Sequence, residues 1–285
     1  MSDQNKSTYQ QGYHRSVTAA HARRTAEVEG AFVLPHLKPD FKILDIGCGP
    51  GTISIGFAKY VPSGHVTGID LTDDVLSQAR EQLSSHDSQP QNITFELGNV
   101  VDGLKYPSDT FDVVFTNQVL IHIPDPVTAL REMKRVVKPG GIVCCREGDF
   151  PSRFYPYPRG LQLFNKYLYC LLHSRTPDLE HPENAPHPPD TRTGSLVHVW
   201  ARLAGFEPQE MVKGASLFMC TTEDERRGLG GLMVERILVG GTGDGFRARG
   251  ATEDEIQCIV DDFNSWIEDV DGWFALLQAE VVLSK

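Results

Sequence analysis

The stretch that decides the fold is Lys42-Ile43-Leu44-Asp45-Ile46-Gly47-Cys48-Gly49-Pro50-Gly51, residues 42–51 of the chain. Its first half is a short apolar run typical of a buried β-strand, and its second half is a glycine-rich turn. Beyond the turn, Ile53, Phe57 and Tyr60 recur at helical spacing. A strand, a glycine turn and a helix in this order predict a β–α–β unit whose backbone approaches a ligand closely at the carboxyl end of the strand.

Strand and helix patterns alternate outward from this stretch, from Phe41 to Arg146. The expected strands are 42–46, 65–70, 93–97, 111–115 and 142–145. Thr72 and Asp125 are typical N-caps for two of the connecting helices, and Lys-Pro-Gly-Gly at 138–141 is expected to end the second of them. This alternation predicts the α/β class, with a Rossmann-like, mostly parallel sheet and helices on both faces.

The pattern changes after Arg146. The following residues are rich first in aromatic side chains and then in proline, which removes backbone donors. We expect a helix at about 160–173, another at 196–204, and two closing strands at 211–220 and 274–283, the last as a hairpin partner. The expected parts of the chain are an N-terminal helical cap (1–40, with a helix through about Leu34), a ligand-binding core (41–149), an inserted lid or substrate region (150–195), and a C-terminal part that completes the sheet (196–285).

The 285-residue chain carries 38 acidic and 27 basic residues, a net charge of −11. This balance argues against nucleic-acid binding, which depends on clustered Lys and Arg, and favours a small uncharged or cationic partner. No apolar run resembles a signal peptide or approaches the ~20 residues of a membrane span, so a cytoplasmic location is expected. The scattered cysteines and the spacing of Asp, Glu and His predict no metal site.

The glycine spacing narrows the choice of ligand. Dinucleotide-binding loops usually have the spacing Gly-x-Gly-x-x-Gly, whereas here Gly47, Gly49 and Gly51 give Gly-x-Gly-x-Gly and Thr52 stands where the third glycine would fall. Asp70 ends the second strand, where a carboxylate can accept both ribose hydroxyl protons. These features together indicate a ligand that contains adenosine.

Five segments resemble the successive motifs of class I S-adenosylmethionine (SAM)-dependent methyltransferases. They are "ILDIGCGPG" at 43–51, "GID" at 68–70, "LGNV" at 97–100, "FDVVFTNQVLIHIPDP" at 111–126 and "LREMKRVVKPGG" at 130–141. Within that superfamily they most resemble the UbiE-like group, which acts on quinones and other small molecules. The resemblance spans about residues 40–146 and implies a seven-stranded sheet with SAM as the cofactor.

The resemblance also implies a role for each cofactor-binding residue. Asp45 would lie near the ligand amine, and the three glycines would pass beneath its methionine and ribose. Asp70 would hold the ribose hydroxyls, and Asn117 would direct its carbonyl toward the amino group. The remaining expected contacts are with the adenine: Leu71 on its face, and Asn99 and the amide of Val100 at its edge. The family usually has Asp where this chain has Asn99, so the amide of Asn99 needs another partner.

His122 is the expected catalytic base. Positioning supplies most of the barrier reduction for an activated methyl group, but a weakly acidic acceptor also needs a base. His122 follows the fourth strand, on the segment that borders the methyl donor. The alternative is that its ring only hydrogen-bonds a loop or caps the helix that begins at Asp125.

Four residues are expected to contact the acceptor: Tyr13 and His14 in the N-terminal segment, and Glu147 and Asp149 after the fifth strand. The alternatives are a frayed terminus and solvated charges. The aromatic residues of 150–169 form either a roof over the acceptor or, as we favour for most of them, the core of the insert.

The function expected from the sequence is methyl transfer from SAM to an O, S, N or C nucleophile of a small molecule. Two alternatives stay open: a SAM-binding regulator without turnover, and a nicotinamide-dependent oxidoreductase, which the glycine spacing disfavours. The sequence leaves the oligomeric state open.

Overall fold

Strand β1 (Lys42–Ile46) lies inside a seven-stranded sheet with the order β3-β2-β1-β4-β5-β7-β6. The structure is a computed structural model that describes residues 24–86, 89–172 and 193–285. The other strands are β2 (His65–Asp70), β3 (Ile93–Leu97), β4 (Phe111–Asn117), β5 (Val137–Tyr155), β6 (Met211–Cys220) and β7 (Trp273–Ser284). The neighbours from β3 to β5 pair in parallel, with Asp45 of β1 between Gly68 of β2 and Phe115 of β4.

Strand β7 runs antiparallel to β5. The amide of Gly140 donates to the carbonyl of Lys285 at 2.9 Å, and the amide of Lys285 donates to the carbonyl of Gly141 at 3.1 Å. The last residue of the chain therefore pairs with the beginning of β5, which requires opposite directions. The expected mostly parallel, seven-stranded α/β sheet is confirmed.

The helices connect these strands and also form a group of their own late in the chain. The α-helices are α2 (Ala26–Glu29), α3 (Thr52–Ala58), α4 (Asp73–Ser85), α5 (Pro126–Val136), α6 (Arg159–Leu172), α7 (Thr193–Leu203), α8 (Glu223–Leu238), α9 (Thr242–Arg247) and α10 (Glu253–Glu268). The 3-10 turns are η2 (Leu34–His36), η3 (Leu120–His122) and η5 (Pro208–Glu210). None of the helices in the described part of the chain is long and apolar enough to cross a membrane.

The chain forms two compact units. The core unit contains the described residues of 24–147, together with 194–215 and 279–285. The accessory unit contains 148–172, Thr193 and 216–278. Each of the strands β5, β6 and β7 contributes residues to both units.

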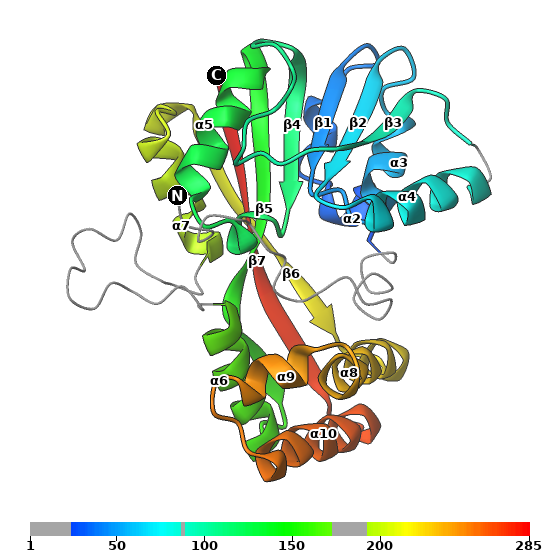
Figure 1. The fold of residues 1–285 in the computed structure, drawn as a ribbon, viewed down its shortest axis with the longest axis vertical. Helices are drawn as coiled ribbons and strands as arrows, with labels where there is room; N and C mark the ends of the chain where they lie inside the picture. Colours follow the sequence, from blue (N-terminus) through cyan, green and yellow to red (C-terminus); the bar gives the residue numbers. More distant parts are fainter. Residues whose placement is uncertain (1–23, 87–88, 173–192) are drawn as a thin grey trace. The chain divides into compact units, whose positions relative to one another are not determined.

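Helices cover both faces of the sheet in the core unit (Figure 1). Side chains alternate across a strand, so Leu44 and Ile46 point to the face that packs against α5 and α7. On the opposite face, the ring of Phe115 meets the ring of Phe57 from α3 edge-on, with centroids 5.1 Å apart. Because both faces are covered, the central strands are buried along most of their length, as parallel strands usually are.

Aromatic side chains form the interior of the accessory unit. The ring of Phe154 lies within 6.5 Å, centroid to centroid, of five other rings, among them those of Phe263, Trp266 and Phe274. Phe164 and Tyr167 of α6 are buried in the same cluster. For these residues the core interpretation is confirmed, whereas Tyr155, Tyr157 and Tyr169 are exposed.

Several secondary-structure predictions need correction. Strand β5 is far longer than 142–145, because pairing with β4 begins at Val137, shifts register across 138–141 and continues into the accessory unit. The predicted boundary between 149 and 150 thus falls inside a strand. At the N-terminus, α2 ends at Glu29 and only the short turn η2 lies near Leu34. Whether 150–195 acts as a lid stays a prediction, since residues 173–192 lie outside the described residues.

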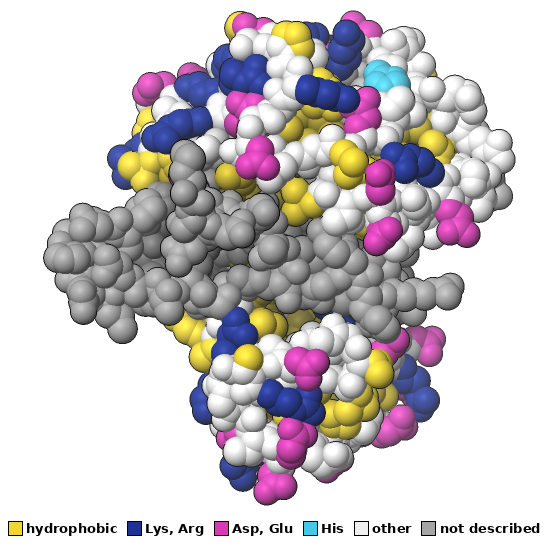
Figure 2. Space-filling view, viewed as in Figure 1, with side chains coloured by type: hydrophobic (Ala, Val, Ile, Leu, Met, Phe, Trp, Pro, Cys, Tyr) yellow, Lys and Arg dark blue, Asp and Glu magenta, His cyan; other side chains and the backbone are white. Residues whose placement is uncertain are grey.

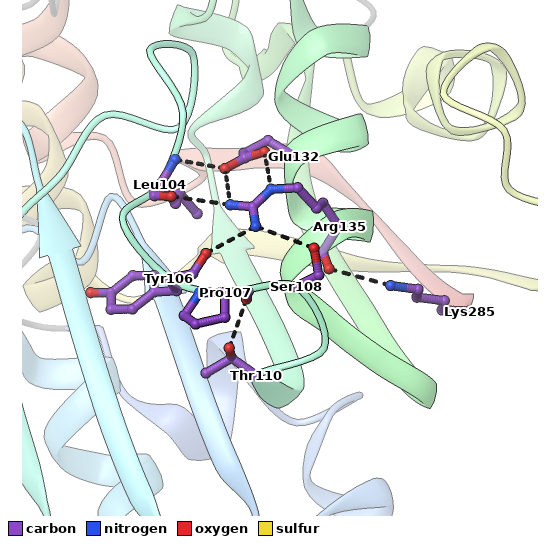
Figure 3. A network of polar contacts seen from close by, with 8 residues as sticks. All are labelled: Leu104, Tyr106, Pro107, Ser108, Thr110, Glu132, Arg135 and Lys285. Atoms are coloured by element: carbon purple, nitrogen blue, oxygen red, sulfur yellow. Dashed lines mark hydrogen bonds and ion pairs between the residues drawn. The ribbon is translucent and has the colours of Figure 1, made fainter.

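The loop that precedes β4 is fastened to α5 by Arg135 (Figure 3). Its guanidinium donates to the carbonyls of Leu104 at 3.0 Å and Tyr106 at 2.9 Å and pairs with Glu132 at 2.6 Å. Glu132 in turn accepts a hydrogen bond from the amide of Leu104 at 2.6 Å. The ammonium group of Lys285 binds the carbonyl of Arg135 at 3.3 Å, so the end of the chain is tied to the same helix.

We predict that Arg135→Met lowers the free energy of unfolding by about 2 kcal/mol, because it removes several partly exposed hydrogen bonds that contribute roughly 0.5–1.5 kcal/mol each. Urea denaturation measures the change. The control is Arg131→Met on the same helix, which removes one exposed hydrogen bond to the carbonyl of Leu203 and should cost less than about 1 kcal/mol. Equal losses in the two variants would show that the network adds nothing to a single surface contact.

Candidate functional site

The glycine loop after β1 has a backbone that favours glycine. Gly47, Gly49 and Gly51 have φ values of +69°, +55° and +81°, all in the left-handed region. The amides of Gly47 and Cys48 both donate to the carbonyl of Ile69, at 2.8 and 3.0 Å, which ties the loop to β2. A Cβ on Gly49 would meet no atom within 4 Å. The backbone of the loop is therefore bound to β2, and the space next to the Cα of Gly49 is open.

Two of the glycines also permit close packing inside the core unit. A Cβ on Gly47 would lie 2.5 Å from Cγ2 of Val119, and one on Gly51 would lie 2.6 Å from the ring of Phe95. Side chains at these two positions would force the loop away from its neighbours. The loop thus needs glycine for its backbone angles and, at Gly47 and Gly51, for its packing.

Asp70 lies at the carboxyl end of β2, directly beside the loop. Its Oδ2 accepts a hydrogen bond from the amide of Gly49 at 2.8 Å, and its Oδ1 accepts one from the amide of Leu71 at 2.7 Å. Burial raises the pKa of this carboxyl, and the two amides oppose the rise. A carboxylate oxygen has a second lone pair, so each oxygen can still accept a hydroxyl proton.

Asp45 is buried at the end of β1, with 3% of its surface exposed. The hydroxyl of Ser54 in α3 donates to its Oδ2. Burial raises the pKa of Asp45 to about 7, Ser54 lowers it and the charge of Asp70 raises it. In this arrangement Asp45 fixes the start of α3 beneath the loop.

The residues expected at the adenine lie together after β2 and β3. Leu71 is 37% exposed and Val100 is buried. Oδ1 of Asn99 accepts a hydrogen bond from the amide of Val101 at 3.1 Å, and its Nδ2 donates to Asp102 at 2.7 Å. Asp102 thus supplies the partner that the amide of Asn99 was expected to need, while the carbonyl of Asn99 is already engaged by backbone.

Asn117 ends β4 and is joined to a residue that the sequence analysis missed. Nη1 of Arg146 donates to Oδ1 of Asn117 at 3.2 Å, and Arg146 also pairs with Glu280 of β7 at 3.4 Å. Arg146 is 4% exposed, and burial lowers its pKa. An arginine within a run of strand residues was the available signal, because arginine is almost never fully buried without a partner.

His122 ends the turn η3, which follows β4. Its amide donates to the carbonyl of Val119 at 2.9 Å, and its side chain is partly buried. Asp125 caps α5 through a 3.0 Å hydrogen bond from the amide of Thr128. His122 is therefore three residues beyond Val119, the residue whose side chain packs on Gly47.

The four expected acceptor contacts are placed differently from one another. Glu147 is completely buried, and its Oε1 accepts hydrogen bonds from the backbone amides of Val119 and Leu120. Asp149 lies on β5 within the accessory unit and is partly buried. Tyr13 and His14 lie outside the described residues. In the described part of the chain, no group of three or more His, Cys, Asp or Glu side chains could hold a metal ion.

The arrangement at the carboxyl ends of β1 and β2 fits SAM. An open space next to Gly49 and a carboxylate whose oxygens can still accept hydroxyl protons suit the ribose and methionine portions of such a ligand. The exposed side chain of Leu71 offers an apolar surface for the adenine. The individual contacts to the cofactor stay predictions.

We predict that Asp70→Ala weakens the binding of S-adenosylhomocysteine at least tenfold, about 1.4 kcal/mol, because the ribose hydroxyls lose a charged acceptor. Isothermal titration measures the affinity. Asp74→Ala is the matched control, since Asp74 is an exposed carboxylate in the first turn of α4. Unchanged affinity in a folded Asp70→Ala variant would remove Asp70 from the site.

A second prediction compares Gly49→Ala with Gly140→Ala. Both glycines have positive φ, +55° and +75°, and an added Cβ meets no atom within 4 Å at either position. The left-handed backbone costs an L-residue about 1–2 kcal/mol, so thermal unfolding should show similar losses of stability. Only Gly49 faces the expected ligand, so only Gly49→Ala should lower the affinity for S-adenosylhomocysteine. Equal affinities would place the ligand elsewhere.

Comparison with known proteins agrees with this site. The family model described as "Methyltransferase domain" matches residues 37–173. An uncharacterized methyltransferase of Schizosaccharomyces pombe is 32% identical over 97% of this chain and 96% of its own length. A demethylmenaquinone methyltransferase of Listeria monocytogenes is 36% identical over 131 residues, 46% of this chain and 52% of its own.

A solved structure has the same fold. The YcgJ protein of Bacillus subtilis superposes with a TM-score of 0.51 at 16% identity, over 90% of this chain and 97% of that chain. Nothing in these matches supports a nicotinamide-dependent oxidoreductase or a regulator without turnover. The chain belongs to the methyltransferase family, as a SAM-dependent enzyme.

Proposed function

We propose that this methyltransferase acts on a small organic molecule, at a nucleophilic oxygen, sulfur, nitrogen or carbon atom. The observation that carries the proposal is the charge of the chain, −11 overall. On the face in Figure 2, the described Lys and Arg side chains are interspersed with Asp and Glu. A nucleic-acid substrate would favour clustered basic residues instead.

The similarity to a demethylmenaquinone methyltransferase supports the small-molecule class, because the name of that relative specifies a quinone acceptor. The match covers less than half of this chain, so it does not single out a quinone. The accessory unit, 148–172 with 216–278, is the part in which an acceptor preference of this chain's own would be encoded. A cytoplasmic location stays a prediction.

The glycine loop, Asp70 and Asn117 have proposed tasks in holding the cofactor. Bound SAM supplies a methyl group that is activated by a positively charged sulfur. The loop of Gly47, Gly49 and Gly51 would let the cofactor approach its backbone without side-chain obstruction, and Asp70 would accept the ribose hydroxyl protons. Asn117 would direct its carbonyl to the methionine amino group. These residues would hold and orient the cofactor, and positioning of this kind lowers the barrier by about 7 kcal/mol or more.

We propose His122 as the base that removes a proton from a weakly acidic acceptor. An imidazole is well suited to this task because its ordinary pKa lies near neutral pH. The turn that carries His122 packs on the glycine loop through Val119, which supports a position close to the methyl group. Tyr13, His14 and Asp149 are kept as proposed acceptor contacts.

The experiment that tests the acceptor class uses SAM with an isotopically labelled methyl group. The purified protein is incubated with panels of phenols and quinones, thiols and amines, and in parallel with RNA and a protein mixture. We expect label in a small molecule together with formation of S-adenosylhomocysteine. Label only in RNA or protein would contradict the proposed function.

His122→Ala is expected to lower kcat by about 10²–10⁴-fold while the affinity for S-adenosylhomocysteine stays within about twofold, since a base acts in the transition state and not in cofactor binding. Steady-state kinetics with an identified acceptor and isothermal titration measure the two quantities. His86→Ala, at the exposed end of α4, is the control. Wild-type turnover in His122→Ala would restrict His122 to a structural role.

A further inference from the structure

The middle of β5, at Arg146 and Glu147, holds the segment that follows β4. The amide of Gln118 donates to the carbonyl of Arg146 at 2.8 Å, and Nη1 of Arg146 donates to Oδ1 of Asn117 at 3.2 Å. Gln118 has φ +56°, a strained angle for a residue other than glycine, so these contacts hold the chain in an unfavourable turn. Arg24 adds a hydrogen bond to Oε1 of Gln118 at 3.2 Å.

Glu147 continues this attachment with its side chain. Its Oε1 accepts hydrogen bonds from the amides of Val119 and Leu120, each at 2.9 Å. The side chain is completely buried, and Oε2 has no hydrogen-bond partner among the described residues. A buried carboxyl that is committed to backbone amides 27 and 28 residues earlier in the chain acts as a clamp on η3.

The clamped turn contacts both halves of the proposed site. Toward the cofactor side, Val119 packs against Gly47 so closely that a Cβ there would lie 2.5 Å from its Cγ2. Toward the acceptor side, the turn ends at His122, whose amide bonds the carbonyl of Val119 at 2.9 Å. A shift of the turn would therefore move the glycine loop and His122 together.

We propose that Glu147 is the positioning residue of this methyltransferase: its carboxylate clamps residues 119–122 and thereby sets the places of the glycine loop and of His122. The part that concerns His122 rests on the proposed function. This role differs from the acceptor contact that the sequence favoured, because no surface of Glu147 is exposed.

The clamp should depend on the ionisation of Glu147. Burial raises the pKa of this carboxyl to about 7, and the amides of η3 and the charge of Arg24 lower it against that effect. The other facing groups are Arg146, whose positive charge favours the carboxylate, and the thiol of Cys145, which is neutral at this pH because burial raises its pKa to about 12. Charged acceptors form stronger hydrogen bonds than neutral ones.

The sign of the pH effect distinguishes the clamp from ordinary unfolding. If the turn detaches while Glu147 stays buried, the carboxyl loses its amides and its pKa rises further, so the attached state binds fewer protons. Deprotonation then favours attachment, and protection increases as pH rises through about 7. If opening instead exposes Glu147 to water, its pKa falls, and protection decreases over the same range.

Hydrogen exchange at the amides of Val119 and Leu120, corrected for intrinsic rates and measured without cofactor between pH 5.5 and 8.5, tests the proposal. In the wild type we expect protection to rise about fivefold with pH. Glu147→Gln keeps one acceptor oxygen and should show no such rise. If protection in the wild type stays constant or decreases as pH rises, the proposal is overturned. This comparison needs no variant.

Asp45→Asn is the matched control for exchange. Asp45 is a second buried carboxyl with its pKa raised to about 7, but it binds Ser54 and not the turn. This variant should keep the wild-type rise at Val119 and Leu120. Loss of the rise in Asp45→Asn would assign it to Asp45 and overturn the role of Glu147.

Kinetics supply a separate readout once an acceptor is known. The kcat of the wild type should exceed that of Glu147→Gln about fivefold at pH 8.5 and by less than twofold at pH 5.5, where the wild-type carboxyl is protonated. A ratio that does not change with pH contradicts positioning by the carboxylate. If no small molecule is methylated at all, the proposed function fails while the exchange result still decides the role of Glu147.

Discussion

The site depends on one constraint: the backbone of the glycine loop must lie directly against its neighbours at the carboxyl end of β1. Gly47 leaves room for Val119, and Gly51 leaves room for Phe95. Because β1 pairs in parallel with β2 and β4, the ends of all three strands meet at one edge of the sheet. That edge brings Asp70 to the amide of Gly49 and places the turn after β4 against Gly47. A side chain at Gly47 would therefore displace both the glycine loop and the turn after β4.

The same edge concentrates buried charge. Asp45 and Glu147 each have a pKa raised to about 7 by burial, and Arg146 is buried nearby with its pKa lowered. Such groups are costly unless hydrogen bonds compensate the lost hydration. Here hydrogen bonds supply the compensation. The hydroxyl of Ser54 donates to Asp45, and backbone amides donate to Glu147. Carboxyls with strongly perturbed pKa values are concentrated at functional sites, where burial and charged neighbours are arranged to shift them.

The sequence predicted the fold well where local periodicity coincides with burial on both faces of the sheet, as in β1 to β4 and α4. The prediction failed at β5, because Lys-Pro-Gly-Gly at 138–141 is typical of a turn. In the structure these residues belong to the strand, and the register of its pairing with β4 shifts across them. It also missed α8 and α10, although both begin with a capping box, at Thr222 with Glu225 and at Thr252 with Glu255. Each capping box is a local signal that predicts the N-terminus of a helix.

The same distinction applies to the residues of the candidate site: local sequence identified some of them and not others. Asp70 and the glycines were identifiable because each stands at a fixed spacing from its own strand, so that chain connectivity alone places them. The placement of Glu147 was not, since its partners are 27 and 28 residues away and meet it only through the pairing of β4 with β5. A glutamate after a strand is usually solvated, and only the tertiary structure shows that this one accepts backbone amides. Residues that act through a neighbouring strand therefore need the assembled sheet for their assignment, whereas those that bind the cofactor beside their own strand do not.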